Sequence, residues 1–161
     1  MASQLTVDNI VGATTANNVH IPGSVVQVVQ TTNNQNQVIS STTLTATYLQ
    51  ADITPKYATS KILILASGGA DTNAAGRGMG LTIFRDGSTN LATLSNGQQR
   101  FDYNISHGAR LQVTSFMHFL DSPATTNSVN YRVYGQSTGS SNVEYPGTYQ
   151  TKVMTLLEIA Q

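Results

Sequence analysis

Residues 81–93, LTIFRDGSTNLAT, have the pattern of a β-hairpin. Two runs in which apolar and polar residues alternate flank Asp86-Gly87, and this dipeptide supplies the positive φ angles that tight hairpin turns need. The stretch predicts a local shape and carries no sign of chemistry. The same combination of short alternating runs and turn residues continues along the chain in both directions.

Further strands are predicted on both sides of this hairpin. Residues 60–67, SKILILAS, form a continuous apolar run of strand length, which is typical of a strand buried on both faces. Other runs alternate with a period of two, so that every second side chain points to the same side. The residues predicted to share one face of their strand are Leu44, Ala46 and Tyr48; Leu111, Val113, Met117 and Phe119; Val129, Tyr131 and Val133; and Val153, Leu157 and Ile159.

The strand pattern predicts an all-β fold. No segment keeps a period of 3.6 with helix caps, and eight or nine short strands are separated by Gly, Pro, Asn and Ser clusters. We therefore expect an antiparallel two-sheet β-sandwich of jelly-roll type over residues 23–161. Residues 1–22 contain one short strand-like run and a Pro-Gly break, and they are predicted to form an N-terminal arm or edge strand.

Composition leaves two interpretations open, assembly with other chains or a polar domain that does not assemble. The 161 residues are enough for one domain that buries roughly two-thirds of its unfolded surface. Charged residues make up 10% of the chain and the formal net charge is zero, whereas ordinary soluble domains have about 25% charged residues. A neutral, charge-poor surface tends to associate. The alternative from composition alone is a polar, uncharged β domain that does not assemble.

Composition also argues against several partners. The 8 basic and 8 acidic residues are scattered, so they form no basic stripe for nucleic acid. The longest apolar run, residues 62–66, is far shorter than the roughly 20 residues that span a bilayer. The first 15 residues show no signal-peptide pattern, and without cysteine neither a disulfide nor a thiolate metal site is possible.

No catalytic group is expected. Residues 135–139, GQSTG, match the G-x-S-x-G nucleophile elbow, but the following SSNVEYPG cannot start the helix that the elbow requires, so Ser137 is interpreted as a turn residue. The acidic residues occur singly, with no spacing that indicates a catalytic pair, and are interpreted as solvated turn residues. They are Asp86, Asp102, Asp121 and Glu144.

No metal or cofactor is expected either. Residues 71–82 begin like a calcium loop, but Ala75 stands at the fifth ligand position and Thr82 stands at the twelfth, where a bidentate glutamate belongs. The histidines, His20, His107 and His118, are far apart in the sequence. His118 lies on the strand face opposite Met117 and Phe119, so we expect it to face solvent or a subunit interface.

Several segments together resemble a family of short virion structural proteins from tailed bacteriophages, especially cyanophages. The matching segments cover most of the chain and determine its fold, so no catalytic residue is implied by them. Members of such families decorate the capsid or form tail-fibre tips, usually as trimers. The segments are LTVDNIVGATTANNVHIPGSVVQVVQ (5–30), ITPKYATSKILILA (53–66), LTIFRDGSTNLA (81–92), FMHFLDSPATTNSVNYRVYGQ (116–136) and TKVMTLLEIAQ (151–161).

The resemblance implies a non-enzymatic virion protein. A fibre usually needs an attachment domain, a shaft and a tip, and this chain has room for one domain with a short arm. We therefore expect a homotrimeric capsid decoration, or cement, protein that bridges subunits of the major capsid protein. The alternative is a trimeric tail-fibre or adsorption-appendage tip, attached to tail components, that binds a host receptor through residues 68–80 and 137–149. A third alternative is a carbohydrate-active enzyme.

Partner contacts are predicted for the arm and for two loop regions. The arm supplies apolar side chains next to a Pro-Gly break, and the loops supply a cation and aromatic rings that could anchor an interface. The predicted partner-binding residues are Leu5, Val7, Ile10, Val11, His20, Ile21, Pro22, Arg77, Tyr145 and Tyr149.

Overall fold

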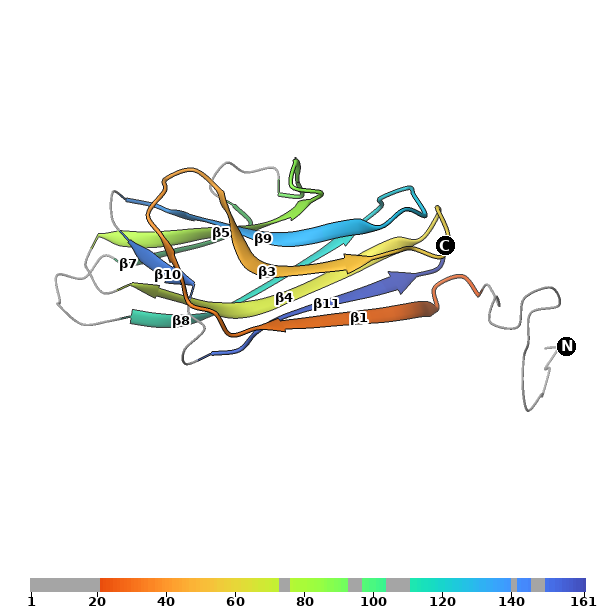
Figure 1. Ribbon diagram of the computed structural model, residues 1–161, viewed down its shortest axis with the longest axis horizontal. Coiled ribbons are helices and arrows are strands. Elements are labelled where there is room, and N and C mark those ends of the chain that lie inside the picture. The colour runs from red at the N-terminus through yellow and green to blue at the C-terminus, as the bar shows by residue number, and fades with distance from the viewer. Residues whose placement is uncertain (1–20, 73–75, 93–96, 104–110, 140–141, 146–149) are drawn as a thin grey trace, which may run out of the picture.

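All regular elements in the computed structural model are β-strands (Figure 1). The structure describes residues 21–72, 76–92, 97–103, 111–139, 142–145 and 150–161, and in this part of the chain no helix is long and apolar enough to cross a membrane. The strands are β1 (Val25–Asn33), β2 (Gln37–Ile39), β3 (Thr45–Ile53), β4 (Lys61–Thr72), β5 (Arg77–Arg85), β6 (Thr89–Asn90), β7 (Gln99–Tyr103), β8 (Leu111–Asp121), β9 (Val129–Ser137), β10 (Val143–Tyr145) and β11 (Lys152–Ile159).

The strands form two antiparallel sheets that pack face to face. Sheet A has the order β1–β11–β4–β8, and the short strands β10 and β2 continue it beside the far end of β4. Sheet B has the order β3–β9–β5, with β6 and β7 both paired to β5. The long strands pair from the outside of the sequence inward: β1 with β11, β3 with β9, β4 with β8 and β5 with β7. This nested pairing is that of a jelly roll, so the predicted fold class is confirmed.

The hairpin predicted around Asp86-Gly87 is confirmed. Asp86 has a φ of 51° and Gly87 a φ of 68°, as a type I′ turn requires. The Ser88 N–H donates to the Arg85 carbonyl at 3.2 Å and closes the turn. The second strand, β6, contains only two residues, because the chain then turns inward and buries Leu91.

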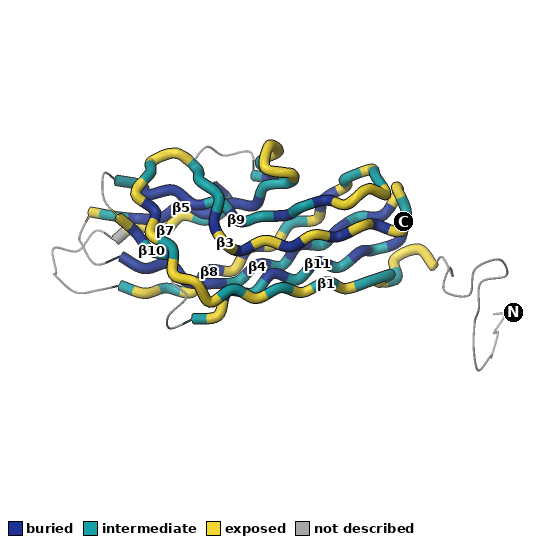
Figure 2. Tube along the Cα trace, viewed as in Figure 1, coloured by how far each residue is buried: buried dark blue, intermediate teal, exposed yellow. Residues whose placement is uncertain are grey.

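The core lies between the sheets, and buried residues alternate with exposed ones along most strands (Figure 2). The predicted inward faces of β8 and β9 are confirmed, since Met117, Val129, Tyr131 and Val133 are all buried. In β4 the inward side chains begin with Ile62, Ile64 and Ala66, whereas the opposite face of β4 is only half-buried from Lys61 to Ser67. The prediction that residues 60–67 are buried on both faces therefore holds for one face within a single chain.

The residues predicted to share one face of β3 do share it, but that face points away from the core. Tyr48 is exposed, and Leu44 and Ala46 are only half-buried, whereas the core side holds Thr47 together with Leu49 and its apolar neighbours along the strand. The Thr47 hydroxyl donates to the Val133 carbonyl at 2.7 Å, and this bond satisfies the buried polar group.

The residues predicted to share one face of β11 also share it, and this face too points outward. Val153, Leu157 and Ile159 point away from the core, and the inward face begins and ends with the charged residues Lys152 and Glu158. Both side chains are completely buried. Their burial is tolerated because each forms hydrogen bonds with backbone groups of the loops that cover the ends of the strand.

The Glu158 carboxylate accepts hydrogen bonds from the backbone N–H groups of Lys56 and Tyr57, at 2.8 and 3.2 Å, and from Gln27 Nε2 at 2.6 Å. At the other end Lys152 Nζ donates to the carbonyl oxygens of Gln35 and Tyr145. Burial lowers the pKa of Lys152. The two side chains thus attach β11 to the connections between other strands.

The predicted arm is described only at its C-terminal end. Residues 1–20 lie outside the described residues, and Ile21 and Pro22 are exposed. The Gly23 N–H donates to the Ala160 carbonyl at 2.8 Å, and the Ala160 N–H donates to Ser24 at 3.0 Å. The chain is therefore joined to sheet A from Gly23 onward.

A close approach between β10 and β4 requires a glycine. The ring of Tyr145 packs against Gly68, and a Cβ added at Gly68 would lie 2.6 Å from the Tyr145 hydroxyl. Tyr145 is completely buried, and burial raises the pKa of its phenol, which therefore stays protonated.

We predict that Gly68→Ala lowers the free energy of unfolding by about 1–3 kcal/mol, because the added methyl group overpacks the site. Chemical denaturation of the purified protein measures the loss. In a Tyr145→Ala background the ring is absent, so the same substitution should cost much less. An equal cost in both backgrounds would contradict the contact.

Candidate interaction surface

The serine of the elbow-like motif belongs to a turn. Ser137 ends β9 and is 1% exposed, and its backbone N–H donates to the Ser41 carbonyl at 2.7 Å. Its hydroxyl donates to the carbonyl of Gly139 at 2.7 Å. The turn therefore uses the hydroxyl that a nucleophile would need to have available.

Asp121 is not the solvated turn residue that the sequence predicts. Its side chain is 8% exposed and accepts hydrogen bonds from Arg85 Nη1 at 2.9 and 3.0 Å. The Tyr131 hydroxyl donates to the same carboxylate at 2.7 Å. Burial raises the pKa of Tyr131, and the hydrogen bond to Asp121 raises it further, so the phenol remains a hydrogen-bond donor. The three side chains join β5, β8 and β9 across the two sheets.

The other three acidic residues lie nearer the surface. Asp86 accepts a hydrogen bond from the Asn130 backbone N–H at 2.9 Å, and Glu144 accepts one from Asn36 at 3.3 Å. Asp102 pairs with Arg100 at 2.6 Å, and both side chains are about half exposed. The hydrogen bond from Arg100 lowers the pKa of Asp102.

One end of the sandwich contains a small, open pocket with an accessible volume of about 20 Å³. Its lining combines apolar side chains, such as Met79 and Phe101, with Arg77 at the start of β5. It is smaller than the roughly 300–1,000 Å³ of typical ligand sites. Across the described ranges, no group of three or more His, Asp or Glu side chains is placed to hold a metal ion.

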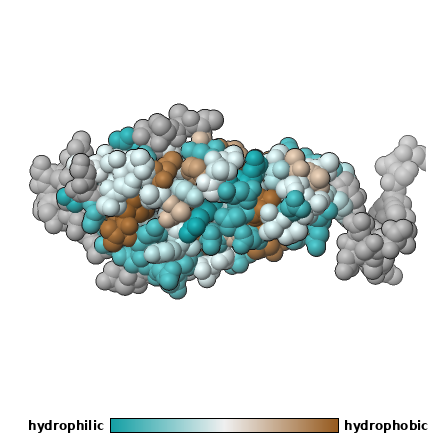
Figure 3. Space-filling view, turned by 45° about the horizontal axis from the view of Figure 1, so that its top comes forward, coloured by the Kyte–Doolittle hydropathy of each residue, from teal (hydrophilic) through white to brown (hydrophobic). Residues whose placement is uncertain are grey.

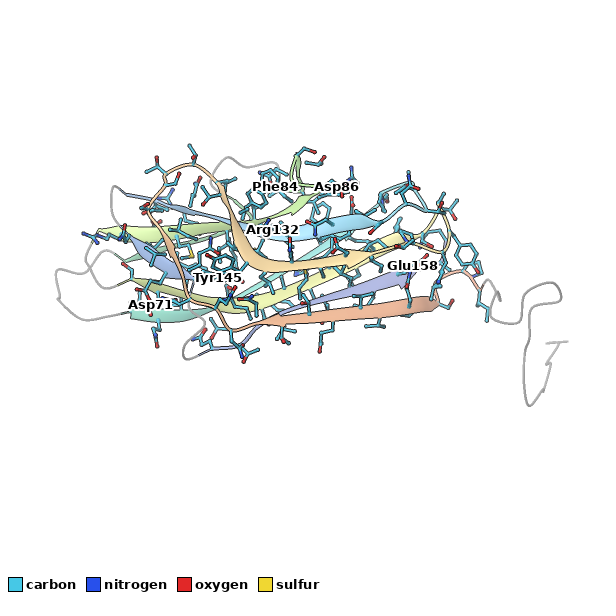
Figure 4. All side chains as sticks on the ribbon, in the orientation of Figure 1. Asp71, Phe84, Asp86, Arg132, Tyr145 and Glu158 are labelled. Atoms are coloured by element: carbon cyan, nitrogen blue, oxygen red, sulfur yellow. The ribbon has the colours of Figure 1, made fainter. Side chains whose placement is uncertain are left out.

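The predicted partner-binding residues have different surroundings. Ile21 is 52% exposed, Pro22 is exposed, and Arg77 is half-buried beside the pocket. Tyr145 was expected in an exposed loop, and this expectation is wrong because its ring lies between the sheets against Gly68 (Figure 4). The remaining predicted residues lie outside the described residues: Leu5, Val7, Ile10, Val11, His20 and Tyr149.

The outer face of sheet A carries an apolar row that the sequence does not reveal. Val28 on β1 pairs with Leu157 on β11, Leu157 pairs with Leu63 on β4, and Leu63 pairs with Leu120 on β8. All four side chains point away from the core, and Val28 and Leu120 are 59% and 49% exposed. Apolar side chains therefore run across the full width of the sheet.

The next two rows, both on the Ser67 side of the leucine row, contain no Asp, Glu, Lys or Arg. One row joins Leu65 to Thr155 and to His118, which is exposed as predicted. The other joins Val153 through Ser67 to Phe116, which is 52% exposed. We call the apolar members of this outer surface the sheet A patch: Val28, Leu63, Leu65, Phe116, Leu120, Val153, Leu157 and Ile159.

The outer face of sheet B is more polar. Asn130 donates to Asp52 at 2.8 Å, and Arg132 donates to the Thr47 carbonyl at 2.6 Å on this face. Phe84 and Tyr134 stack on each other, with ring centroids 4.1 Å apart. Figure 3 tips the upper part of Figure 1, where β5 and β9 lie, toward the viewer, and its hydrophobic patches are small and separate.

Comparison with known proteins does not assign the chain to a family. No protein-family model matches it, and no curated protein was found to be similar. The candidate site therefore depends on the geometry of the two sheet faces.

We predict that Asp121→Asn lowers the free energy of unfolding by about 2–4 kcal/mol, because it leaves the partly buried guanidinium of Arg85 without its counter-charge. Asp102→Asn is the matched control. It removes an exposed Arg–Asp pair and should leave stability nearly unchanged, because solvent screens that pair. Urea denaturation of both variants makes the comparison, and equal losses would show that the Asp121 pair has no special role.

Proposed function

We propose that this chain is a structural component of a tailed-phage particle and works as a homotrimer. Within the particle we propose a capsid decoration protein that bridges subunits of the major capsid protein. The resemblance to short virion proteins supports the location and the trimer, and the exposed apolar surface supports the assembly.

The observation that carries the proposal is the amount of apolar surface left in water by a neutral domain. Large hydrophobic side chains are about half exposed in several strands, and the formal net charge of the chain is zero. Covering such surface stabilises an assembly by roughly 25 cal/mol per Å². The exposed large hydrophobic residues are Ile21, Val25, Val28, Val38, Tyr48, Phe116 and Leu120.

A decoration protein would act through mass action. A ligand that binds only the assembled shell stabilises the shell relative to its dissociated subunits. A neutral surface suits dense coverage, because neighbouring copies with little net charge repel one another weakly. The low charge content of the chain thus favours many copies placed close together.

We predict that the purified protein is a trimer at micromolar concentration, as measured by light scattering coupled to size exclusion. The molar mass should be three times the 17.1 kDa of one chain. Because the surface that would be buried has few charges, the trimer should persist from low to high salt. A monomer at these concentrations would contradict the proposal.

We predict that an antibody label against the chain covers the whole phage head in electron micrographs of intact particles. Labelling restricted to the tail would contradict decoration and favour a fibre tip. Absence of label from purified particles, with the antigen detected only in the lysate, would contradict a virion component altogether.

A further inference from the structure

We propose that the sheet A patch is the surface through which copies of this chain bind one another. The partner is a second copy, and the outer face of sheet B points away from the contact. This inference rests on the proposed homo-oligomer and adds which of the two sheets is buried in it.

The patch is connected through Leu65. Its apolar row, Val28–Leu157–Leu63–Leu120, crosses all four long strands of sheet A. Leu65 lies beside this row in a second row that is otherwise polar, and Val153 and Phe116 lie in the third row, diagonal to Leu65. Single exposed apolar residues are ordinary on protein surfaces, but a contiguous group marks an interaction site. On sheet B the exposed Tyr48 belongs to β3, whose next outward residues are Gln50 and Asp52.

The size of the patch fits the centre of a protein–protein interface. With about 4.8 Å between strands and about 3.3 Å per residue, the rows cover about 15 by 20 Å, or about 300 Å² in projection. A standard interface buries about 800 Å² of accessible surface on each partner. Such an interface has an apolar centre surrounded by a polar rim. Thr114, which points outward beside the patch, can supply part of such a rim, and Gln30 and Thr32 add polar groups within the second and third rows.

The charge pattern favours a second copy as the occupant. The three central rows contain no Asp, Glu, Lys or Arg, and Lys61 stands next to Ile159 at the margin. A charged partner would lose its hydration here without gaining a counter-charge. In a symmetric assembly equivalent surfaces gather around one axis, where like charges would repel, and an uncharged surface avoids this cost.

The backbone beneath the patch is regular. The register of β4 with β8 runs without a shift from Ile62↔Asp121 to Thr72↔Leu111, and that of β4 with β11 runs without a shift from Lys61 to Ser67. A surface that is already ordered loses little conformational entropy on binding. The phenyl ring of Phe116 also lies beside the imidazole of His118, with centroids 6.1 Å apart, so two rings stand together near the β8 edge.

The test compares a double substitution on sheet A with a single control substitution on sheet B. Phe116→Glu/Leu120→Glu changes two side chains that are 52% and 49% exposed, so the monomer's own core is unchanged. Tyr48→Glu is the control, because Tyr48 is 49% exposed on the outer face of β3. We expect the double variant to raise the dissociation constant about 100-fold or more and to run as a folded monomer, while Tyr48→Glu keeps the wild-type mass.

The outcomes separate this inference from the proposed function. A wild-type oligomer that persists in the double variant overturns the sheet A assignment and leaves the proposed function intact. Dissociation by Tyr48→Glu to the same extent also overturns the assignment. A wild-type protein that is monomeric at micromolar concentration overturns both.

A second measurement does not depend on charged substitutions. The chain has no cysteine, so Leu120→Cys and Tyr48→Cys each introduce a single thiol. We expect maleimide to label Leu120→Cys at least about 10-fold more slowly than Tyr48→Cys in the oligomer, and at a similar rate after dilution to the monomer. Equal rates in the oligomer would overturn the assignment.

Discussion

The pairing of β4 with its neighbours is the constraint on which the rest of the fold depends. β4 bonds to β8 along one edge and to β11 and then β10 along the other, so one strand joins three distant segments of the chain. Its inward residues Ile62 and Ile64 pack in the core, and Gly68 leaves room for Tyr145. A slip of one residue would exchange the two faces of β4 and expose the isoleucines.

The sequence predicted strands and fold class well and strand faces less well. In β8 and β9 most apolar residues occupy every second position, so the face that points inward could be chosen from alternation alone. β3 and β11 have apolar residues at both parities, and the choice then depended on Thr47, Lys152 and Glu158, which look like surface residues. Their buried hydrogen bonds connect positions as distant as Glu158 and Lys56, and no local pattern predicts them.

The candidate surface was missed for a related reason. Val28, Leu63, Leu120 and Leu157 are unremarkable in their own segments, and they become one row only when the register of four strands is known. The local signal that was available is the two-sided apolar character of β4 and β11. For residues 60–67 it predicted burial on both faces, and a second copy on sheet A would supply the burial that one chain leaves incomplete. For Tyr145 the error was the reverse, since a residue expected to be exposed is buried. Its turn-rich neighbours suggested a loop, whereas the distant Gly68 leaves space for its ring in the core.

An interface with so few charges must obtain its specificity from shape. Charged pairs usually fix orientation by penalising wrong arrangements, and the three central rows of sheet A have none. The patch is bounded at the Ile159 end by Lys61, a charge that a partner must leave in water. In a trimer the three copies bring their sheet A surfaces to one threefold axis, and each copy contributes apolar side chains over the same length of strand and leaves Lys61 at the margin. This links the low charge of the chain to assembly from identical subunits.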